Sequence, residues 1–408
     1  MVQNKKKIIN DPLYGFITIP FDIVYDIIEH PYFQRLRRIR QLGLTSMVYP
    51  GAYNTRFHHA IGAMHLAMQA ADVLVQKGHE IKEEERKGLA IAILLHDIGH
   101  GPFSHALEHT LVKGITHEEL SIKLMKELNV EFNGQLDLAL DIFQNKYSKK
   151  YLYQLISSQL DVDRLDYLNR DSFYTGVQEG VVGVERIIKL LNVKNGELVV
   201  DHKGIYSIEK FLVARRIMYW QVYLHKTVVS AEFLLINILK KAKQLARSGE
   251  ELFCSPSLRE FLYNDHDQES FQKNTDLLET FADLDDYDIL SAIKVWKKHN
   301  DYTLSTLCEW MVNRKLYTVE LSKEEIPQER IDELQKGLAK KYKFPTEDFP
   351  LVVFSSSVQN IAYDAEIGIK ILYKNGGLSD IAEASDHLNL NSLSTPVKKH
   401  FVCYPKPY

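Results

Sequence analysis

Cysteine is scarce in this sequence, and so are the features that mark secreted and membrane proteins. The 408 residues contain only three cysteines, which are far apart and form no CxxC pair: Cys254, Cys308 and Cys403. This spacing excludes a disulfide framework and a thiolate metal site, and it favours a reducing compartment. The opening segment Met1–Lys7 is polar and basic with no apolar run behind it, unlike a signal peptide. We therefore expect a cytoplasmic protein.

Long hydrophobic runs and a strong charge imbalance are also missing. The longest apolar stretches, such as Gly88–Leu95, are far too short to cross a bilayer, which predicts no membrane partner. The formal net charge is only −4, which argues against a general electrostatic attraction to nucleic acid. The basic segment Arg35–Arg40 keeps nucleic-acid binding open, but only as a secondary property.

The overall composition is that of an ordinary globular protein. Hydrophobic residues make up 45% of the chain, with only 12 prolines and 20 glycines, so a sizeable core can form. The length exceeds what one hydrophobic core usually serves. We therefore expect a catalytic domain over residues 1–320 and a small α+β region over residues 321–408.

Most segments of the chain have helical periodicity, so the expected fold is mainly α, a helical bundle with a small α+β C-terminal portion. The expected helices are Phe21–Glu29, Tyr32–Leu42, Gly88–Leu95, Thr116 to about Leu128, Ser157–Asp171 and Ile208–Lys226. Strand signals are few. They predict a hairpin of Glu197–Val200 with Gly204–Ser207, and a small sheet of Leu351–Phe354 with Ile369–Tyr373 and the Asn375-Gly376-Gly377 turn.

Histidine is the unusual residue. The chain has 16, and nine of them lie between His58 and His117. Four groups in and beyond this cluster could bind one metal ion: His59, His96, Asp97 and Asp163. Mixed imidazole and carboxylate ligation suits Fe, Mn, Zn or Mg and leaves positions open for water and phosphate oxygens. On spacing alone, His58 and His65 could equally be ligands or merely core and surface histidines.

The cluster contains more histidines than one metal ion needs as ligands. His100, His105 and His117 flank the proposed ligands, and imidazole near neutral pH can donate a proton to a leaving oxygen. Glu108 follows His105 by three residues and could orient and charge it. The alternative is that some of these histidines only pack or cap helices.

Several motifs, in this order, resemble those of the HD-domain deoxynucleoside triphosphate triphosphohydrolases. They are Ile9-Asn10-Asp11-Pro12, Phe33-Gln34-Arg35-Leu36-Arg37, Tyr49-Pro50-Gly51-Ala52, Arg56-Phe57-x-His59, His96–His105, Asp161-Val162-Asp163-Arg164-x-Asp166-Tyr167 and His225-Lys226. The resemblance covers roughly residues 7–320. It implies an HD-domain bundle and assigns the metal to His59, His96, Asp97 and Asp163. It also gives His105 the role of general acid. We expect no sterile-alpha-motif domain, because the similar region begins almost at Met1.

The same resemblance implies a set of substrate contacts. Some of these side chains recur every four residues and so lie on one face of a helix. Taken by itself, such spacing is more typical of an amphipathic helix at the protein surface than of a binding site. The resemblance makes Arg56, Arg164 and Arg215 contacts of the triphosphate, because forked guanidinium groups suit phosphate oxygens. It places Gln41 and Asp171 at the sugar 3′-hydroxyl and Tyr223 against C2′, which favours deoxyribose. Tyr167 and Tyr219 complete the expected substrate site.

This chain departs from the vertebrate family member at four of these positions. That enzyme has Lys where this chain has Arg164, and His where it has Tyr219. It has an acid and Ser where this chain has His58 and Ala60. The charge at position 164 is kept, so the departures concern the range of substrates.

The resemblance further implies activation by a guanine nucleotide bound between subunits of a dimer or tetramer. The matching positions are Ile8, Asn10, Glu29, Gln34, Arg37, Phe57, Lys203 and Arg314. Glu29 can accept hydrogen bonds from the guanine N1–H and 2-amino groups, and Arg37 can meet phosphate. An arginine of the vertebrate site falls at Asp201, so the match is partial. A constitutively active oligomer is the alternative.

The leading hypothesis is hydrolysis of a deoxynucleoside triphosphate to deoxynucleoside and tripolyphosphate. One alternative is another HD-type phosphohydrolase, either a nucleotidase or a cyclic-nucleotide phosphodiesterase. The other is a non-catalytic nucleotide-sensing or nucleic-acid-binding protein.

Overall fold

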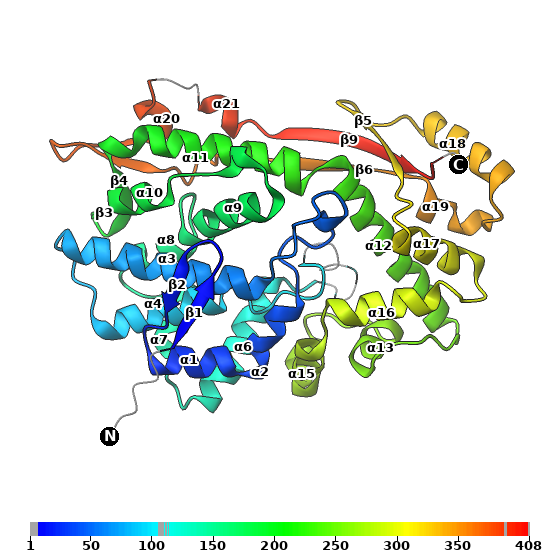
Figure 1. The fold of residues 1–408 in the computed structure, drawn as a ribbon, viewed down its shortest axis with the longest axis horizontal. Helices are drawn as coiled ribbons and strands as arrows, with labels where there is room; N and C mark the ends of the chain where they lie inside the picture. Colours follow the sequence, from blue (N-terminus) through cyan, green and yellow to red (C-terminus); the bar gives the residue numbers. More distant parts are fainter. Residues whose placement is uncertain (1–6, 105–109, 111, 113, 387–389, 407–408) are drawn as a thin grey trace.

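The computed structural model describes residues 7–104, 110, 112, 114–386 and 390–406. The protein is mainly α-helical, as expected, with short strands added to a helical body (Figure 1). The helices described up to residue 247 are α1 (Asp22–Glu29), α2 (Pro31–Gln34), α3 (Arg56–Gln76), α4 (Glu83–Leu95), α6 (His117–Glu131), α7 (Asp137–Phe143), α8 (Lys150–Ile156), α9 (Val162–Thr175), α10 (Val184–Leu190), α11 (Ile205–Met218) and α12 (Lys226–Arg247).

Helix α3 is the centre of this body and packs against α4 and α9. Its buried face consists largely of alanines, which allow the neighbouring helices to approach closely: Ala60, Ala63, Ala67, Ala70 and Ala71. In α4 the segment Gly88–Leu95 is buried without a break, because a helix that is apolar on all sides must lie inside the protein. The site described below lies where these three helices meet.

Several expected helix boundaries are confirmed. Helix α1 ends at Glu29, and Pro31 starts a new helix. That second helix does not reach Leu42 as expected, since α2 passes into a short 3₁₀ turn, η1 (Arg35–Arg38). Thr116 caps α6 through a capping box with Glu119. Helix α9 starts at Val162 rather than at residue 157, because Asp161 is its N-cap.

The predicted continuous helix Ile208–Lys226 is wrong. Helix α11 ends at Met218, and residues Tyr219–Tyr223 form a π-helical turn, η6. The amide of Leu224 donates to the carbonyl of Tyr219 at 2.7 Å, five residues back. Helix α12 then starts in a new direction, 53° from the first segment. Such π-turns frequently occur at functional sites, and here the turn carries two tyrosines assigned to substrate.

The predicted hairpin of Glu197–Val200 with Gly204–Ser207 is also wrong. Strand β4 (Glu197–Asp201) pairs instead with β3 (Leu191–Lys194), which precedes it. The connecting Asn195-Gly196 turn has positive φ at both residues, as a two-residue type I′ hairpin requires. Gly204 instead ends a 3₁₀ turn, η5 (His202–Gly204), at the start of α11.

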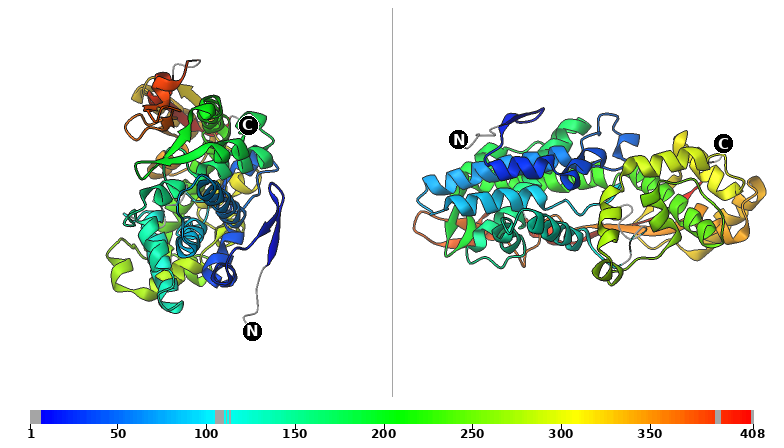
Figure 2. Two further views of the ribbon diagram at one scale, coloured as in Figure 1. Left: turned by 90° about the vertical axis from the view of Figure 1, so that its left-hand side faces the viewer. Right: turned by 90° about the horizontal axis from the view of Figure 1, so that it is seen from below.

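The helices between residues 256 and 312 follow α12. They are α13 (Pro256–Tyr263), α14 (Ser270–Lys273), α15 (Thr275–Asp283), α16 (Asp286–Trp296) and α17 (Tyr302–Val312). Among them, α13, α16 and α17 lie towards the right of the molecule in Figure 1, with a further view in Figure 2. Beyond residue 320 the helices are α18 (Gln328–Lys341), α19 (Phe349–Val352), α20 (Ile381–Ala384) and α21 (Asn391–Ser394). The C-terminal part is therefore α+β, as expected.

One sheet joins this C-terminal part to the helical body, and a second sheet is formed by strands from residue 318 onward. Strand β7 (Lys370–Leu372) pairs in parallel with β4 and antiparallel with β8 (Leu378–Asp380). The second sheet has the order β5-β9-β6, with β5 (Thr318–Ser322), β6 (Phe354–Asn360) and β9 (Val397–Tyr404). The expected pairing of Leu351–Phe354 with Ile369–Tyr373 is wrong, since Leu351 and Val352 are helical and β6 pairs with β9. A domain boundary at 320 stays a prediction, and β5 runs across it.

No single helix in the described part of the chain is long and apolar enough to cross a membrane. One bent pair, His202–Tyr223 with Lys226–Arg247, passes that test by length and composition only.

Candidate metal centre and substrate cavity

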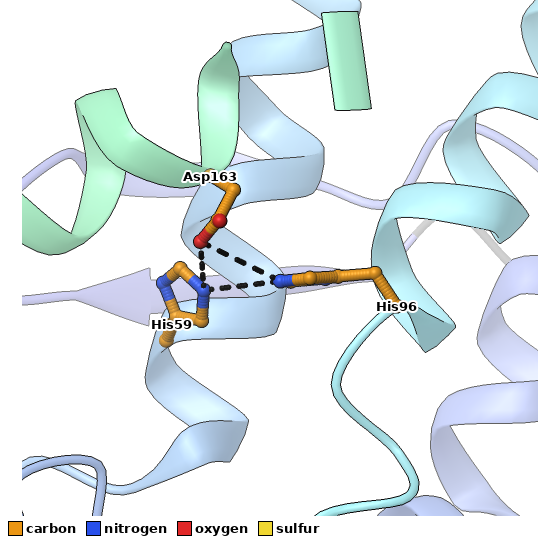
Figure 3. Close-up of side chains that lie close together, drawn as sticks. All are labelled: His59, His96 and Asp163. Atoms are coloured by element: carbon orange, nitrogen blue, oxygen red, sulfur yellow. Dashed lines mark hydrogen bonds and ion pairs between the residues drawn. The ribbon is translucent and has the colours of Figure 1, made fainter. Parts of the chain in front are cut away.

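Three side chains from three different helices lie close together inside the helical body, and Figure 3 shows them. His59 comes from α3, His96 follows the last residue of α4, and Asp163 lies in the first turn of α9. Nε2 of His59 lies 3.1 Å from Oδ1 of Asp163 and 3.3 Å from Nε2 of His96. Nε2 of His96 lies 3.6 Å from the same Asp163 oxygen.

Asp97 is the fourth member of this cluster. One of its carboxylate oxygens lies 3.4 Å from Nε2 of His96, and the other lies 3.8 Å from Nε2 of His59. The second oxygen also pairs with the guanidinium of Arg56. All four ligands predicted from the sequence are therefore brought together, although they come from distant parts of the chain.

Both imidazoles are held so that Nε2 faces the centre of the cluster. Nδ1 of His59 lies 2.7 Å from Oδ2 of Asp166, and Nδ1 of His96 lies 2.6 Å from the carbonyl oxygen of Ile93. These oxygens accept a hydrogen bond from Nδ1–H and leave Nε2 free to donate its lone pair. Metal-binding histidines are commonly oriented in this way.

Asp166 was not predicted as a site residue, and it anchors a buried network. Arg170 donates to both oxygens of Asp166, at 2.9 and 3.0 Å, and to Asp11 at 2.8 Å. A Cβ atom at position 62 would lie 2.1 Å from Arg170 Nη2 and 2.2 Å from Asp166 Oδ1, so only glycine fits there. The sequence signal for Asp166 was its position three residues after Asp163, one helical turn along the same face.

The cluster fits a divalent metal ion. Ligand atoms about 2.1 Å from one ion lie about 3 Å from each other, close to the spacing seen here. Burial alone would lower the pKa of His59, but its hydrogen bonds to the carboxylates of Asp163 and Asp166 raise it to about 10. Burial would raise the pKa of Asp163, but His59 and His96 hold it far below its ordinary value. The carboxylates therefore favour positive charge at this point, which a metal ion supplies.

A second histidine pair adjoins the cluster through Asp97. His100 Nε2 lies 3.4 Å from Oδ1 of Asp97, and the ring of His100 stacks on that of His117 with centroids 3.8 Å apart. Burial and the nearby Arg56 hold the pKa of His100 well below its usual value, so its ring is neutral near pH 7. Gly99 allows this contact, since a Cβ there would lie 2.1 Å from the His117 carbonyl oxygen. His105 and Glu108 lie outside the described residues, so their roles stay predictions.

A cavity of about 430 Å³ opens beside these groups. The metal-cluster residues Asp97 and Asp163, together with His100 and His117, line one part of it. Most of the predicted substrate residues line it as well: Gln41, Arg56, Arg164, Tyr167, Asp171, Tyr219 and Tyr223. Arg215 is buried, and it is not among the lining residues.

Two of the three predicted sugar contacts, Asp171 and Tyr223, are hydrogen-bonded to each other. Asp171 accepts from Asn54 at 2.9 Å and from the Tyr223 hydroxyl at 3.0 Å. Burial raises the pKa of Asp171 to about 6, although both hydrogen bonds oppose the rise. The side-chain oxygen of Gln41 is buried with no hydrogen-bond partner in the structure. An acceptor pair is therefore available here for a hydroxyl donor.

Each predicted phosphate arginine is held by a neighbouring group. Arg56 donates to the Ser104 hydroxyl at 2.7 and 2.9 Å and pairs with Asp97. Arg164 pairs with Asp161, and Arg215 donates to Gln159 at 3.5 Å. The Nε atoms of Arg164 and Arg215 are buried without a hydrogen-bond partner, so both side chains retain unused donors.

The residues expected at a regulatory nucleotide site are only partly together in one chain. Arg37 donates to Gln34 at 2.9 Å, and its guanidinium lies 3.5 Å from the centroid of the Phe57 ring. The remaining members are Ile8 and Asn10 on β1 (Ile8–Asp11), Glu29 at the end of α1, Lys203 in η5 and Arg314 after α17. Among the described residues, no hydrogen bond or ion pair links Lys203 or Arg314 to the Gln34–Arg37 pair. Arg314 instead donates to the Met47 carbonyl at 2.7 Å.

The structure also shows the surroundings of His58, of His65 and of the basic segment, whose roles the sequence left open. His58 completes the N-terminal cap of α3 with Thr55, and His65 lies 2.9 Å from Gln69, so neither joins the metal cluster. In the basic segment, Arg35 is fully buried and donates to the carbonyls of Ile98 and Leu284. Its role is therefore structural.

Comparison with known proteins agrees with this geometry. The HD domain model matches residues 56–171, which include all four residues of the metal cluster, and the HD associated region matches residues 182–250. The crystal structure of a phosphohydrolase from Bacteroides thetaiotaomicron superposes with a TM-score of 0.96. It has 53% sequence identity and covers 98% of this chain and 100% of that chain.

Two curated relatives are each 34% identical to this chain. The uncharacterized protein YwfO of Bacillus subtilis matches over 323 residues, which are 77% of this chain and 72% of that protein. The deoxynucleoside triphosphate triphosphohydrolase SAMHD1 homolog of Dictyostelium discoideum matches over 269 residues, 61% of this chain and 52% of that protein. The chain thus spans about half the length of that second relative. On its metal cluster and these matches, the chain belongs to the HD-domain phosphohydrolase family.

Proposed function

We propose that the protein is a metal-dependent triphosphohydrolase that converts a deoxynucleoside triphosphate to a deoxynucleoside and tripolyphosphate. The observation that carries this proposal is one cavity that contains both the metal cluster at Asp163 and, two turns further along α9, the predicted sugar contact Asp171 with its partner Tyr223. Two helical turns span about 11 Å, which suits the distance from a phosphate chain to a deoxyribose. The name of the Dictyostelium relative supports the same substrate class.

In this proposal His59, His96, Asp97 and Asp163 hold the metal ion. When bound, the ion neutralises charge on the phosphate oxygens and activates water. Arg164, which lines the cavity, binds the triphosphate through its guanidinium group, and Arg56 holds Asp97 in place. Water attacks the α-phosphorus, and the bond to O5′ breaks.

The leaving O5′ needs a proton. His105 is the proposed donor, with Glu108 orienting it. His100 and His117 lie stacked beside Asp97 and hold the cavity wall on that side. Because the His100 ring is neutral, it contributes hydrogen bonding without adding charge.

Discrimination against ribose comes from Tyr223. Its hydroxyl is fixed on Asp171 at 3.0 Å, and its ring packs at 6.1 Å from that of Tyr167 and at 5.1 Å from that of Tyr219. An aromatic ring held this firmly against C2′ leaves a 2′-hydroxyl crowded and without a partner.

The decisive experiment is product analysis after incubation with each deoxynucleoside triphosphate and Mn²⁺. Deoxynucleoside and intact tripolyphosphate are expected from the wild type. Release of orthophosphate or pyrophosphate would indicate a nucleotidase or another HD-type reaction instead. Asp163→Ala is the control, because loss of this ligand should lower both the metal content and the turnover. The matched Asp332→Ala, at an exposed position on α18, should change neither.

We further propose that a guanine nucleotide activates the protein by binding between subunits of a homo-oligomer. The support is the contact of Arg37 with Gln34 and with the buried ring of Phe57, which leaves Arg37 itself exposed and available to phosphate. Lys203 and Arg314, which do not reach these residues within one chain, would come from neighbouring subunits.

A further inference from the structure

Glu232 lines the substrate cavity, and the proposed function so far gives it no role. Four acidic residues line the cavity: Asp97, Asp163, Asp171 and Glu232. The first three have clear partners in Arg56, His59 and Tyr223. For Glu232, no hydrogen bond or ion pair is found in the described part of the chain. Burial raises the pKa of its carboxyl to about 7, and no neighbouring charge opposes the rise.

The position of Glu232 on α12 points it into the cavity. Successive residues of an α-helix are rotated by about 100°. Ser230 donates to the Tyr317 carbonyl, Asn237 donates to the Leu351 carbonyl, and Phe233 packs on Phe354, so this side of α12 faces the C-terminal part. By the same rotation, Glu232 lies well away from that side, and it lines the cavity with Leu224.

The neighbours of α12 show which wall of the cavity Glu232 occupies. Along α9, Asp163 lies at the metal cluster and Asp171 lies two turns further on, where it bonds to Tyr223 at 3.0 Å. Helix α12 packs on the π-turn that carries Tyr223 and on the 3₁₀ turn η2 (Thr45–Met47), whereas the proposed metal ligands come from α3, α9 and the end of α4. Glu232 therefore belongs to the wall that contains Tyr223 and Leu224 and not to the wall that carries the metal ligands.

We propose that Glu232 reads the nucleobase of the substrate and favours bases that present N–H donors, with guanine preferred and thymine disfavoured. This inference rests on the proposed function for the identity of the substrate. A carboxylate accepts two parallel N–H bonds from guanine N1 and its 2-amino group. Thymine presents one N–H between two carbonyl oxygens, which repel a carboxylate. A ligand with suitable donors would also supply the hydrogen bonds that Glu232 otherwise lacks.

The test compares wild type with Glu232→Gln, whose amide has nearly the same shape but offers one donor and one acceptor. Relative kcat/KM values for dGTP and dTTP are measured in mixtures of the two. We expect the guanine-to-thymine ratio to fall by about tenfold or more in Glu232→Gln. The matched control Glu250→Gln, at an exposed position after α12, should keep the wild-type ratio. An unchanged ratio in Glu232→Gln would overturn the inference.

A binding measurement separates this inference from the proposed reaction. Affinities for the α,β-imido analogues of dGTP and dTTP are measured with both proteins in an Arg37→Ala background, which removes the proposed activator site. If no nucleotide is hydrolysed but the affinity ratio depends on Glu232, the inference holds and the proposed reaction fails. If both nucleotides are hydrolysed and neither ratio depends on Glu232, the reaction stands and the inference fails.

Discussion

Nδ1 of His59 lies 2.7 Å from a carboxylate oxygen of Asp166, on the side of the imidazole opposite to Asp163. This contact sets the ring orientation and keeps the proton on Nδ1, so that Nε2 is available to a metal ion. Asp166→Asn should therefore weaken metal binding by about 10- to 100-fold without removing a ligand. The measurement is a Mn²⁺ titration of chelator-treated protein, with Asp332→Asn as the exposed control. Equal affinities in wild type and Asp166→Asn would contradict the positioning role.

Arg170 is fully buried between Asp166 and Asp11, and its removal would leave two buried carboxylates without their partner. Breaking a buried ion pair costs about 3–5 kcal/mol. Arg170→Met should therefore lower the melting temperature clearly. Arg330→Met is the matched control, because Arg330 pairs with Glu320 at the surface and such pairs contribute about 0–1 kcal/mol. Similar melting temperatures for the two variants would show that the buried network is not stabilising.

Asp171 provides a prediction about pH. Burial raises its pKa to about 6, so the carboxyl is ionised above that pH and protonated below it. Only the ionised form accepts hydrogen bonds at both oxygens. We expect kcat/KM to fall as the pH is lowered from 7 to 5. In Asp171→Asn the value should be low throughout and the fall across pH 6 should disappear. If the variant keeps the same inflection, another group is responsible for it.

Arg37 provides a prediction about regulation. Added guanine nucleotide should raise the turnover of other deoxynucleotides, because binding between subunits links nucleotide concentration to assembly. Arg37→Ala should abolish this stimulation while the metal content stays normal. Turnover and sedimentation are measured together over a range of protein concentrations. Identical rates with and without guanine nucleotide would reject the regulatory proposal and leave the catalytic one intact.

The sequence pointed to four candidate ligands through its histidine cluster and through motifs that resemble the HD-domain family, and the structure brings these side chains together. Their role as metal ligands stays a prediction. Asp166 was missed because its partner, His59, lies on another helix and the contact depends on packing. The carboxyl of Glu232 was missed for the same reason, since nothing in the local sequence shows that α12 turns this residue into the cavity.

The differences between the predicted and the observed fold have separate causes. The π-turn at Tyr219–Tyr223 contains no glycine or proline, so its sequence is compatible with a continuous helix. The pairing of β4 with β3 could have been predicted, because Asn195-Gly196 is a strong hairpin signal. The pairing of β4 with β7 could not have been predicted, because Val200 and Ile371 are far apart in the sequence and come together only in the complete fold.

Strand β9 lies between β5 and β6, although it follows both of them in the sequence. A polypeptide emerging from the ribosome therefore presents β5 and β6 before the strand that joins them exists. Until then, both earlier strands have unpaired backbone groups on the edges that will face β9. Because such distant pairings form slowly, a nascent chain paused before residue 397 would present edges prone to mispairing. The central strand of this sheet is thus the last of its three strands to be synthesised.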